Sequence, residues 1–317
     1  MKLSKKINVY IISGFLGSGK TTLLNHLLKQ FNEEKNVVIE NEFGKINIDA
    51  TLINGAFENV FELTNGCICC SINNQLLETL SRIVSLENQP DNLFIETTGI
   101  ADAGEIAAHF TSLFIAKAFD LKKIITVVDA ENLLFYKDSN VEVEKQIVAA
   151  DCVVINKSTL VKTEIIENIK DFIQSINPYT TIVLSENGLL DRMDLATENS
   201  PKTFISDAIY KSKSIHKIKT LMYETEALFD IQNLKYELFR NLYLYYHQIY
   251  RIKGYVLNSK KEVFLVQTTG KTVEINPVEN QKMTKSQLVF IGKELELKSI
   301  ERLLKSSIIK KKKFQSV

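Results

Sequence analysis

Eight residues near the N-terminus have the types and spacing of a phosphate-binding loop. The segment from Gly14 to Thr21 fits the pattern G-x-x-x-x-G-K-[ST], in which backbone N–H groups surround phosphates. We expect Lys20 to neutralise the β- and γ-phosphates and the Thr21 hydroxyl to bind Mg²⁺. The predicted contacts of the loop with phosphate are Gly14, Gly17, Ser18, Gly19, Lys20, Thr21 and Thr22. The chemistry predicted here is the binding and cleavage of a nucleoside triphosphate.

A second motif, Glu96-Thr97-Thr98-Gly99, ends an apolar run. A carboxylate in this place holds Mg²⁺ in many phosphate-loop proteins, and the glycine N–H contacts the γ-phosphate. We therefore assign Lys20, Thr21 and Glu96 to catalysis. Thr21 and Glu96 are also assigned to Mg²⁺, and Gly99 to the nucleotide.

A third motif, Asn156-Lys157-Ser158-Thr159, lies where guanine-binding proteins carry Asn-Lys-x-Asp. Asn156 is expected to bond the base, and the stem of Lys157 to lie against its face. Thr159 stands where an aspartate would accept two hydrogen bonds from the guanine edge. Loss of such a charge-assisted pair costs roughly 1.5–3 kcal/mol, so these residues leave guanine and adenine both open.

Three cysteines fall within four residues, at Cys67, Cys69 and Cys70. As thiolates they suit Zn²⁺ and other borderline or soft ions, with a further ligand from another segment. Glu40 and Glu42 are the carboxylates available at the end of a nearby apolar run. A redox thiol pair and plain burial are the alternatives to metal binding.

Short apolar runs that each end at a polar residue predict the elements that position these motifs. Strands and helices alternate over the first part of the chain, which favours an α/β fold with a mostly parallel sheet. In such sheets ligands gather at the carboxyl ends of the strands. The expected strands are 7–12, 37–40, 92–96, 124–129, 152–156 and 181–184, with a helix over 22–28 after the phosphate loop.

A polar stretch around 185–201 predicts a boundary between two domains. We expect a phosphate-loop domain over 1–200, which includes the cysteine motif, and a smaller C-terminal α+β domain over 201–317. The expected elements of the second domain are strands at 215–224, 254–257, 262–268, 273–276 and 287–292, a helix from Asp230 to about Ile249, and a last helix over 297–306.

Composition narrows the class of protein. The chain has 317 residues, is 45% hydrophobic, and carries a net charge of only +1, which gives no sign of a nucleic-acid partner. No apolar run is long enough to span a membrane, and the N-terminus lacks the layout of a signal peptide. Four cysteines do not make a disulfide scaffold. We expect a cytoplasmic protein with no membrane partner.

Taken together, the motifs resemble those of the CobW-type phosphate-loop GTPases, a group of metal chaperones and metal-insertion factors. The resemblance rests on the phosphate loop continued to Asn25, on Glu40-Asn41-Glu42-Phe43-Gly44 with Ile48-Asp49, on Asn65-Gly66 before the cysteines, on 95–102 and on Val127-Val128-Asp129-Ala130. The segments 251–254 and 288–292 resemble the second domain of the family.

The resemblance implies binding of GTP, slow Mg²⁺-dependent hydrolysis, and binding of Zn²⁺ or Co²⁺. It assigns Glu40, Cys67, Cys69 and Cys70 to the Zn²⁺ or Co²⁺ site. It places Glu42 and Asp49 on a segment that responds to the nucleotide and lies between the two sites. We assign Asp49 to Mg²⁺ together with Thr21 and Glu96. Thr159 departs from the aspartate of the family.

Three functions follow from these motifs. The first is a GTPase that delivers metal to a client metalloprotein, as a monomer or a weak dimer that depends on nucleotide or metal. The second is a nucleotide- and metal-loaded sensor or scaffold with negligible turnover. The third is an ATP-using phosphate-loop protein, suggested by Thr159. Slow turnover is expected because none of the arginines lies in or near the motifs; they are Arg82, Arg192, Arg240, Arg251 and Arg302.

Overall fold

The computed structural model describes residues 5–40, 60–62, 71–112, 114–136, 141–191, 218–245, 248–269, 272–278 and 283–309. Contacts within the chain divide it into two units, one of residues 1–174 with 178–202 and one of 175–177 with 203–317. The predicted boundary at residue 200 lies between 191 and 218, outside the described residues, and stays a prediction. Each unit is described by itself.

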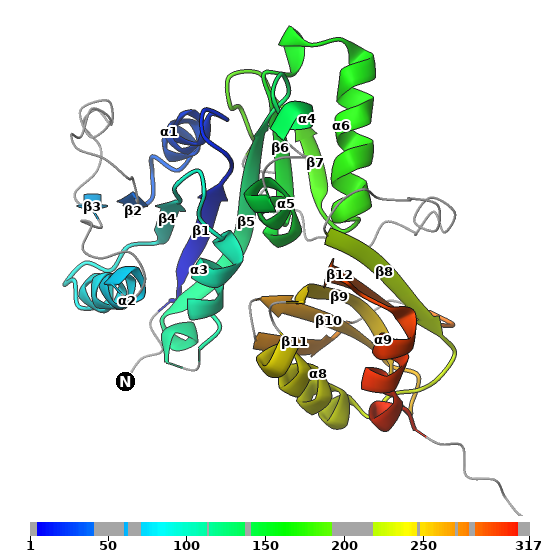
Figure 1. Cartoon of the computed structure of the whole chain (residues 1–317). Coiled ribbons are helices and arrows are strands. Elements are labelled where there is room, and N and C mark those ends of the chain that lie inside the picture. Colours follow the sequence, from blue (N-terminus) through cyan, green and yellow to red (C-terminus); the bar gives the residue numbers. More distant parts are fainter. Residues whose placement is uncertain are drawn as a thin grey trace, which may run out of the picture. The chain divides into compact units, whose positions relative to one another are not determined.

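The first unit is built on a seven-stranded sheet in which every neighbouring pair of strands is parallel (Figure 1). The strand order is β3-β2-β4-β1-β5-β6-β7, so the phosphate loop after β1 leaves the sheet near its centre. The strands are β1 (Ile7–Ser13), β2 (Asn36–Glu40), β3 (Val60–Glu62), β4 (Asn92–Glu96), β5 (Phe119–Asp129), β6 (Cys152–Asn156) and β7 (Thr181–Leu184).

Helices cover both faces of this sheet, because successive strand residues point to opposite faces and both sets are apolar. The alternation is visible in β1, where Val9 and Ile11 join a core with α2, α3 and α5, whereas Tyr10 and Ile12 join a core with α1. The helical elements are α1 (Lys20–Gln30), α2 (Ser71–Val84), α3 (Ala103–His109), η1 (Ile115–Lys117), α4 (Leu133–Tyr136), α5 (Val141–Ala149), η2 (Ser158–Leu160) and α6 (Thr163–Ile176).

The α/β fold with a parallel sheet is confirmed. Each predicted strand of the first domain is present, and most boundaries agree within a residue. The exception is β5, which begins at Phe119 rather than Ile124, because the polar segment from Asp120 to Lys123 pairs with β1. Pairing of β5 with β6 begins only at Ile125, so β1 is the partner of this first part of the strand. Its polar residues interrupt the apolar pattern, so the sequence did not indicate the extension.

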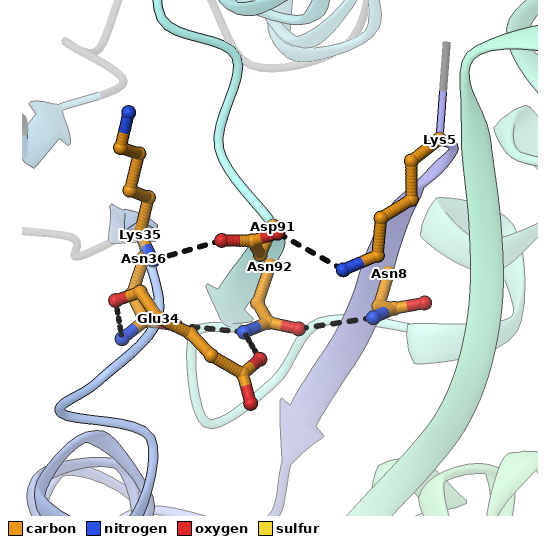
Figure 2. A network of polar contacts seen from close by, with 7 residues as sticks. All are labelled: Lys5, Asn8, Glu34, Lys35, Asn36, Asp91 and Asn92. Carbon is orange, nitrogen blue, oxygen red and sulfur yellow. Dashed lines mark hydrogen bonds and ion pairs between the residues drawn. The ribbon is translucent and has the colours of Figure 1, made fainter. Parts of the chain in front are cut away.

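Three asparagine side chains connect neighbouring strands at the amino ends of β1, β4 and β2 (Figure 2). Asn8 donates from Nδ2 to Oδ1 of Asn92 at 3.1 Å, and Asn92 donates from Nδ2 to Oδ1 of Asn36 at 2.9 Å. Asn36 in turn donates to the carbonyls of Phe31 and Glu34. Asn92 is fully buried, and its partners satisfy the polar atoms that burial removes from water.

The second unit is an antiparallel five-stranded sheet of order β11-β10-β9-β12-β8, with α8 and α9 packed on it (Figure 1). Its elements are β8 (Ile218–Thr225), α8 (Ile231–Tyr245), β9 (Ile249–Leu257), β10 (Val263–Thr269), β11 (Thr272–Pro277), β12 (Ser286–Lys293), α9 (Leu297–Leu304) and η4 (Lys305–Ser307). The predicted α+β class of this unit is confirmed.

The predicted end of the long helix near Ile249 is wrong. Asp230 does cap α8 as expected, since its Oδ1 accepts from the N–H groups of Gln232 and Asn233. The helix ends at Tyr245, however, and Ile249 already belongs to β9. The apolar and tyrosine-rich residues there fit the repeat of a helix as well as that of a strand. Residues from Ile249 onward form a strand because they pair with β10 and β12.

None of the helices within the described ranges has the length and apolar character that crossing a membrane requires.

Candidate functional site

The phosphate loop leaves the carboxyl end of β1 and turns directly into α1. Gly14 and Gly19 have φ angles of 142° and 102°, which side chains on L-residues rarely permit. A Cβ atom on Gly14 would overlap the Val127 carbonyl of β5, and one on Gly19 would overlap the side-chain amide of Asn156 at the end of β6. The loop therefore lies tightly against two other strands and needs glycine at both positions.

The N-terminus of α1 is open to an anion. Its N-cap residue is Gly19, no side chain caps it, and its first turn contains no acidic residue. By contrast, the N-terminus of α3 is capped by Asp102, which accepts from the N–H groups of Gly104 and Glu105. Because the first N–H groups of a helix carry partial positive charge, α1 presents them toward the loop where phosphates are predicted.

Thr21 and Glu96 meet beside this helix end. Thr21 donates from Oγ1 to Oε1 of Glu96 at 2.8 Å, although 75 residues separate them in the chain. Lys20 folds back on its own loop, with Nζ 3.4 Å from the carbonyl oxygen of Phe15. Two oxygen ligands and an ammonium group therefore converge at the loop, which is a donor set that suits Mg²⁺ next to phosphate.

Glu40 ends the strand next to Glu96. The register of β2 and β4 pairs Glu40 with Glu96, so the two residues are neighbours at the carboxyl edge of the sheet. Glu40 is partly buried there. Among the residues assigned to the Zn²⁺ or Co²⁺ site, it alone falls within the described ranges.

Gly99 lies directly against the phosphate loop. A Cβ atom at Gly99 would approach Leu16 to within 2.8 Å of its backbone nitrogen, so the two backbones are in close contact. Gln146 of α5, which is buried, donates from Nε2 to the carbonyls of Gly99 at 3.0 Å and Ala101 at 3.4 Å. This glutamine was not anticipated from sequence, and its only signal is a polar residue beside the apolar run Ile147-Val148-Ala149.

Asn156 connects the phosphate loop to the segment after β7. Its Nδ2 donates to the carbonyl of Ser18 at 2.9 Å, and its Oδ1 accepts from the N–H of Gly188 at 2.8 Å. An amide oxygen has a second lone pair, so the predicted bond to the base stays a prediction beside these two. Asn156 thus links the phosphate loop to the segment around Gly188, although both are far from it in the sequence.

Lys157 is fixed at both ends of its side chain. Its backbone is left-handed, with φ 58°, and its Nζ lies 2.7 Å from Oδ2 of Asp129 at the end of β5. Asp129 also accepts from the Glu131 N–H and from Nδ2 of Asn132. Burial opposes ionisation of Asp129, but these hydrogen bonds, with that from Lys157 foremost, outweigh it and hold its pKa below the ordinary value.

The remaining predicted metal residues cannot be placed. Cys67, Cys69, Cys70, Glu42 and Asp49 lie outside the described residues. Within the part of the chain that the structure describes, no group of three or more His, Cys, Asp or Glu side chains has the arrangement of a metal site. The cysteine motif therefore stays a prediction.

Comparison with protein families agrees with the geometry. Residues 8–184 match the CobW/HypB/UreG nucleotide-binding domain, which is more than half of the chain. The chain belongs to the CobW/HypB/UreG family. Residues 218–308 match in addition the C-terminal domain of the cobalamin synthesis protein cobW. Both parts of the resemblance stated from sequence are thereby confirmed.

Curated relatives of this CobW-family chain carry names that refer to zinc. It is 30% identical over 212 residues to the zinc chaperone CobW of a Sinorhizobium species, covering 58% of this chain and 60% of the relative. It is 38% identical over 157 residues to the zinc chaperone YjiA of Escherichia coli, covering 48% and 49%. It is 34% identical over 194 residues to the zinc-regulated GTPase metalloprotein activator 1 of Schizosaccharomyces pombe, covering 58% and 47%. The chain thus matches about half the length of these relatives.

Solved structures show the same fold. The Zn(II)-bound YjiA GTPase of E. coli superposes with a TM-score of 0.70, covering 95% of this chain and 99% of that one at 22% sequence identity. At this identity the likeness establishes the architecture of both units and not the activity.

Proposed function

We propose that this CobW-family protein binds GTP with Mg²⁺, hydrolyses it slowly, and uses the nucleotide cycle to deliver Zn²⁺ or Co²⁺ to a client metalloprotein. The observation that carries the proposal is the hydrogen bond between Thr21 and Glu96, 2.8 Å long, beside the uncapped start of α1. A hydroxyl, a carboxylate and the uncapped N–H groups of a helix start at one place suit a magnesium-bound triphosphate.

Each residue in and beside the phosphate loop has a separate role in the proposal. The N–H groups of the loop and of α1 hold the phosphates, and Lys20 turns from the Phe15 carbonyl to the β- and γ-phosphates. Thr21 and Glu96 hold Mg²⁺, which when bound neutralises the charge that develops on the phosphates. Asp49 joins them in the proposal, although it lies outside the described residues. Gly99 contacts the γ-phosphate, because its backbone already lies against Leu16.

Zinc or cobalt is the cargo in this proposal. The ligands are Glu40 and the thiolates of Cys67, Cys69 and Cys70, a mixed oxygen and sulfur set that suits Zn²⁺. The names of the curated relatives support zinc over cobalt. The proposed order of events is that bound GTP completes the metal site and hydrolysis loosens it, so that the metal passes to the client. Cytoplasmic residence and a monomer or weak dimer remain predictions.

The test is calorimetric titration of GTP and of ATP, each with Mg²⁺, into the full chain with and without an equimolar amount of Zn²⁺. We expect GTP to bind more tightly than ATP and Zn²⁺ to tighten GTP. By linkage, GTP must then tighten Zn²⁺ by the same factor. Equal affinity for GTP with and without Zn²⁺ would contradict coupled delivery, and equal affinity for ATP would contradict the choice of guanine.

Two other functions can be tested with the same protein sample. Thr159 favours an ATP-using protein, because it removes the carboxylate that reads guanine, and the ATP titration decides that case. A sensor or scaffold with negligible turnover would bind GTP and Zn²⁺ in the same way. A single-turnover measurement with Mg²⁺ separates it from a GTPase, because only a GTPase converts the bound GTP to GDP.

A further inference from the structure

The ion pair between Asp129 and Lys157 stands at the edge of the sheet where the nucleotide is proposed to bind. Asp129 ends β5 and Asn156 ends β6, and the register of the two strands pairs these residues. Lys157 follows Asn156, so its side chain crosses from the end of β6 to the end of β5. Asp129 also lines a small cavity together with Phe15, Leu16 and Ser18 of the phosphate loop.

The carboxylate of Asp129 is held in a single orientation. Its Oδ1 accepts from the Glu131 N–H at 2.9 Å, and its Oδ2 accepts from Nδ2 of Asn132 at 2.9 Å and from Nζ of Lys157 at 2.7 Å. Its side chain is 11% exposed, against 33% for that of Lys157. A carboxylate that two donors besides Lys157 already hold is a rigid anchor for the Lys157 ammonium group.

Lys157 loses its freedom through this anchor. A free lysine side chain samples many rotamers, and ordering it on a ligand costs affinity. Here the left-handed backbone, with φ 58°, fixes one end of the stem and Asp129 fixes the other. The methylene groups between them form a surface that exists before any ligand arrives.

We propose that Asp129 is a positioning residue that holds the stem of Lys157 as a preformed platform for the purine base. The proposal rests on the proposed function, because it takes the segment from Asn156 to Thr159 as the base site. The new element is that an aspartate contributes to the affinity for the base without touching base or phosphate. It also predicts that the platform accepts either purine, since a methylene stem reads no base edge.

The experiment compares Asp129→Asn, Lys157→Met and the double variant of the full chain, with GDP, ADP and inorganic pyrophosphate as probes. We expect Asp129→Asn to weaken GDP by about tenfold, since it frees a rotamer-rich side chain. Lys157→Met keeps an apolar stem but loses its anchor, so we expect a similar loss. The double variant should lose no more than either single one, because both remove the same interaction. Pyrophosphate has no base, so its affinity should stay within about twofold of the parent.

Asp91→Asn is the matched control. Asp91 forms an ion pair of the same kind with Lys5 at 3.0 Å (Figure 2). It directly precedes β4 and so lies at the amino ends of the parallel strands, whereas Asp129 lies at their carboxyl ends. Asp91→Asn should leave the affinity for every probe unchanged. If Asp129→Asn does not fold, Lys157→Met carries the test alone, because the Lys157 side chain is partly exposed and Asp129 keeps its two other donors.

Three results would overturn the platform. They are unchanged GDP affinity in either single variant, equal weakening of GDP and pyrophosphate, and losses that add in the double variant. A wrong assignment of guanine would give another result. The parent would then bind ADP as tightly as GDP, and Asp129→Asn would weaken the binding of both. A parent that binds neither purine nucleotide would overturn the platform and the proposed function together.

Discussion

Glu40 and Glu96 lie opposite each other in register at the carboxyl ends of β2 and β4. Facing residues of neighbouring parallel strands project from the same face of a sheet, about 4.8 Å apart along the hydrogen-bonding direction. One of them is the proposed ligand of the cargo metal and the other is the proposed ligand of Mg²⁺. A single backbone pairing therefore connects the two proposed ligands.

Replacement of Glu40 by Gln should separate the two sites. If Zn²⁺ tightens GTP through this pairing, the effect should be in the usual range of about 5- to 150-fold in the parent and fall toward unity in the variant. GTP affinity without Zn²⁺ should not change. Calorimetric titration measures both quantities. Glu167→Gln, on an exposed part of α6, is the control, and full coupling in Glu40→Gln would show that Glu40 does not bind the cargo.

Replacement of Glu96 by Gln should affect hydrolysis more than binding. Gln keeps an acceptor for the Thr21 hydroxyl but loses the charge that is proposed to hold Mg²⁺. Loss of one charge-stabilising group in a transition state typically costs about 10²–10³ in rate, so we expect a loss of that size in single-turnover hydrolysis. GDP binding without Mg²⁺ should be nearly unchanged. A variant as active as the parent would remove Glu96 from the site.

Replacement of Gln146 by Leu should loosen the contact between Gly99 and the phosphate loop. The Gly99 carbonyl would lose its donor in a buried place, and the Ala101 carbonyl would lose its donor in a partly buried one. We expect a loss of about 1–3 kcal/mol in the free energy of unfolding, measured with urea. We also expect the preference for GTP over GDP to shrink. Gln89→Leu removes an exposed bond to the Val84 carbonyl and is the control for both measurements.

Acid should destabilise the protein partly through Asp91. A hydrogen bond from Lys5, and a second from the Lys35 N–H, hold the pKa of Asp91 below its ordinary value of 3.8. Folding therefore favours the ionised form, and this stabilisation is present above pH 3.8 and lost as the pH falls through the lower folded-state value. Asp91→Asn should lack that part of the slope. Urea unfolding at a series of pH values, at low salt, measures the difference, and parallel profiles would contradict it.

The sequence indicated those parts of the site that are encoded by short, continuous segments of the chain. The phosphate loop is a local motif, and Glu96 and Asn156 were expected at the edge because each ends an apolar run. The contacts of Gln146 with Gly99 and of Asn156 with Gly188 join segments that only the folded sheet brings together. The end of α8 was misjudged for a related reason, because pairing with distant strands overrode a local pattern that fitted both periods.

The paired asparagines at the amino ends of β2 and β4 share one register with the glutamates at the other ends of these strands. Asn36 and Asn92 are paired in β2 and β4, and four residues further along each strand stand Glu40 and Glu96. A slip of β2 by one residue would turn every side chain of the strand to the opposite face and leave Ile39 beside Glu96. Such a slip would also break the buried amide bonds among the asparagines. The amide bonds at the amino ends of β2 and β4 thus favour the alignment that brings two carboxylates together at the carboxyl ends.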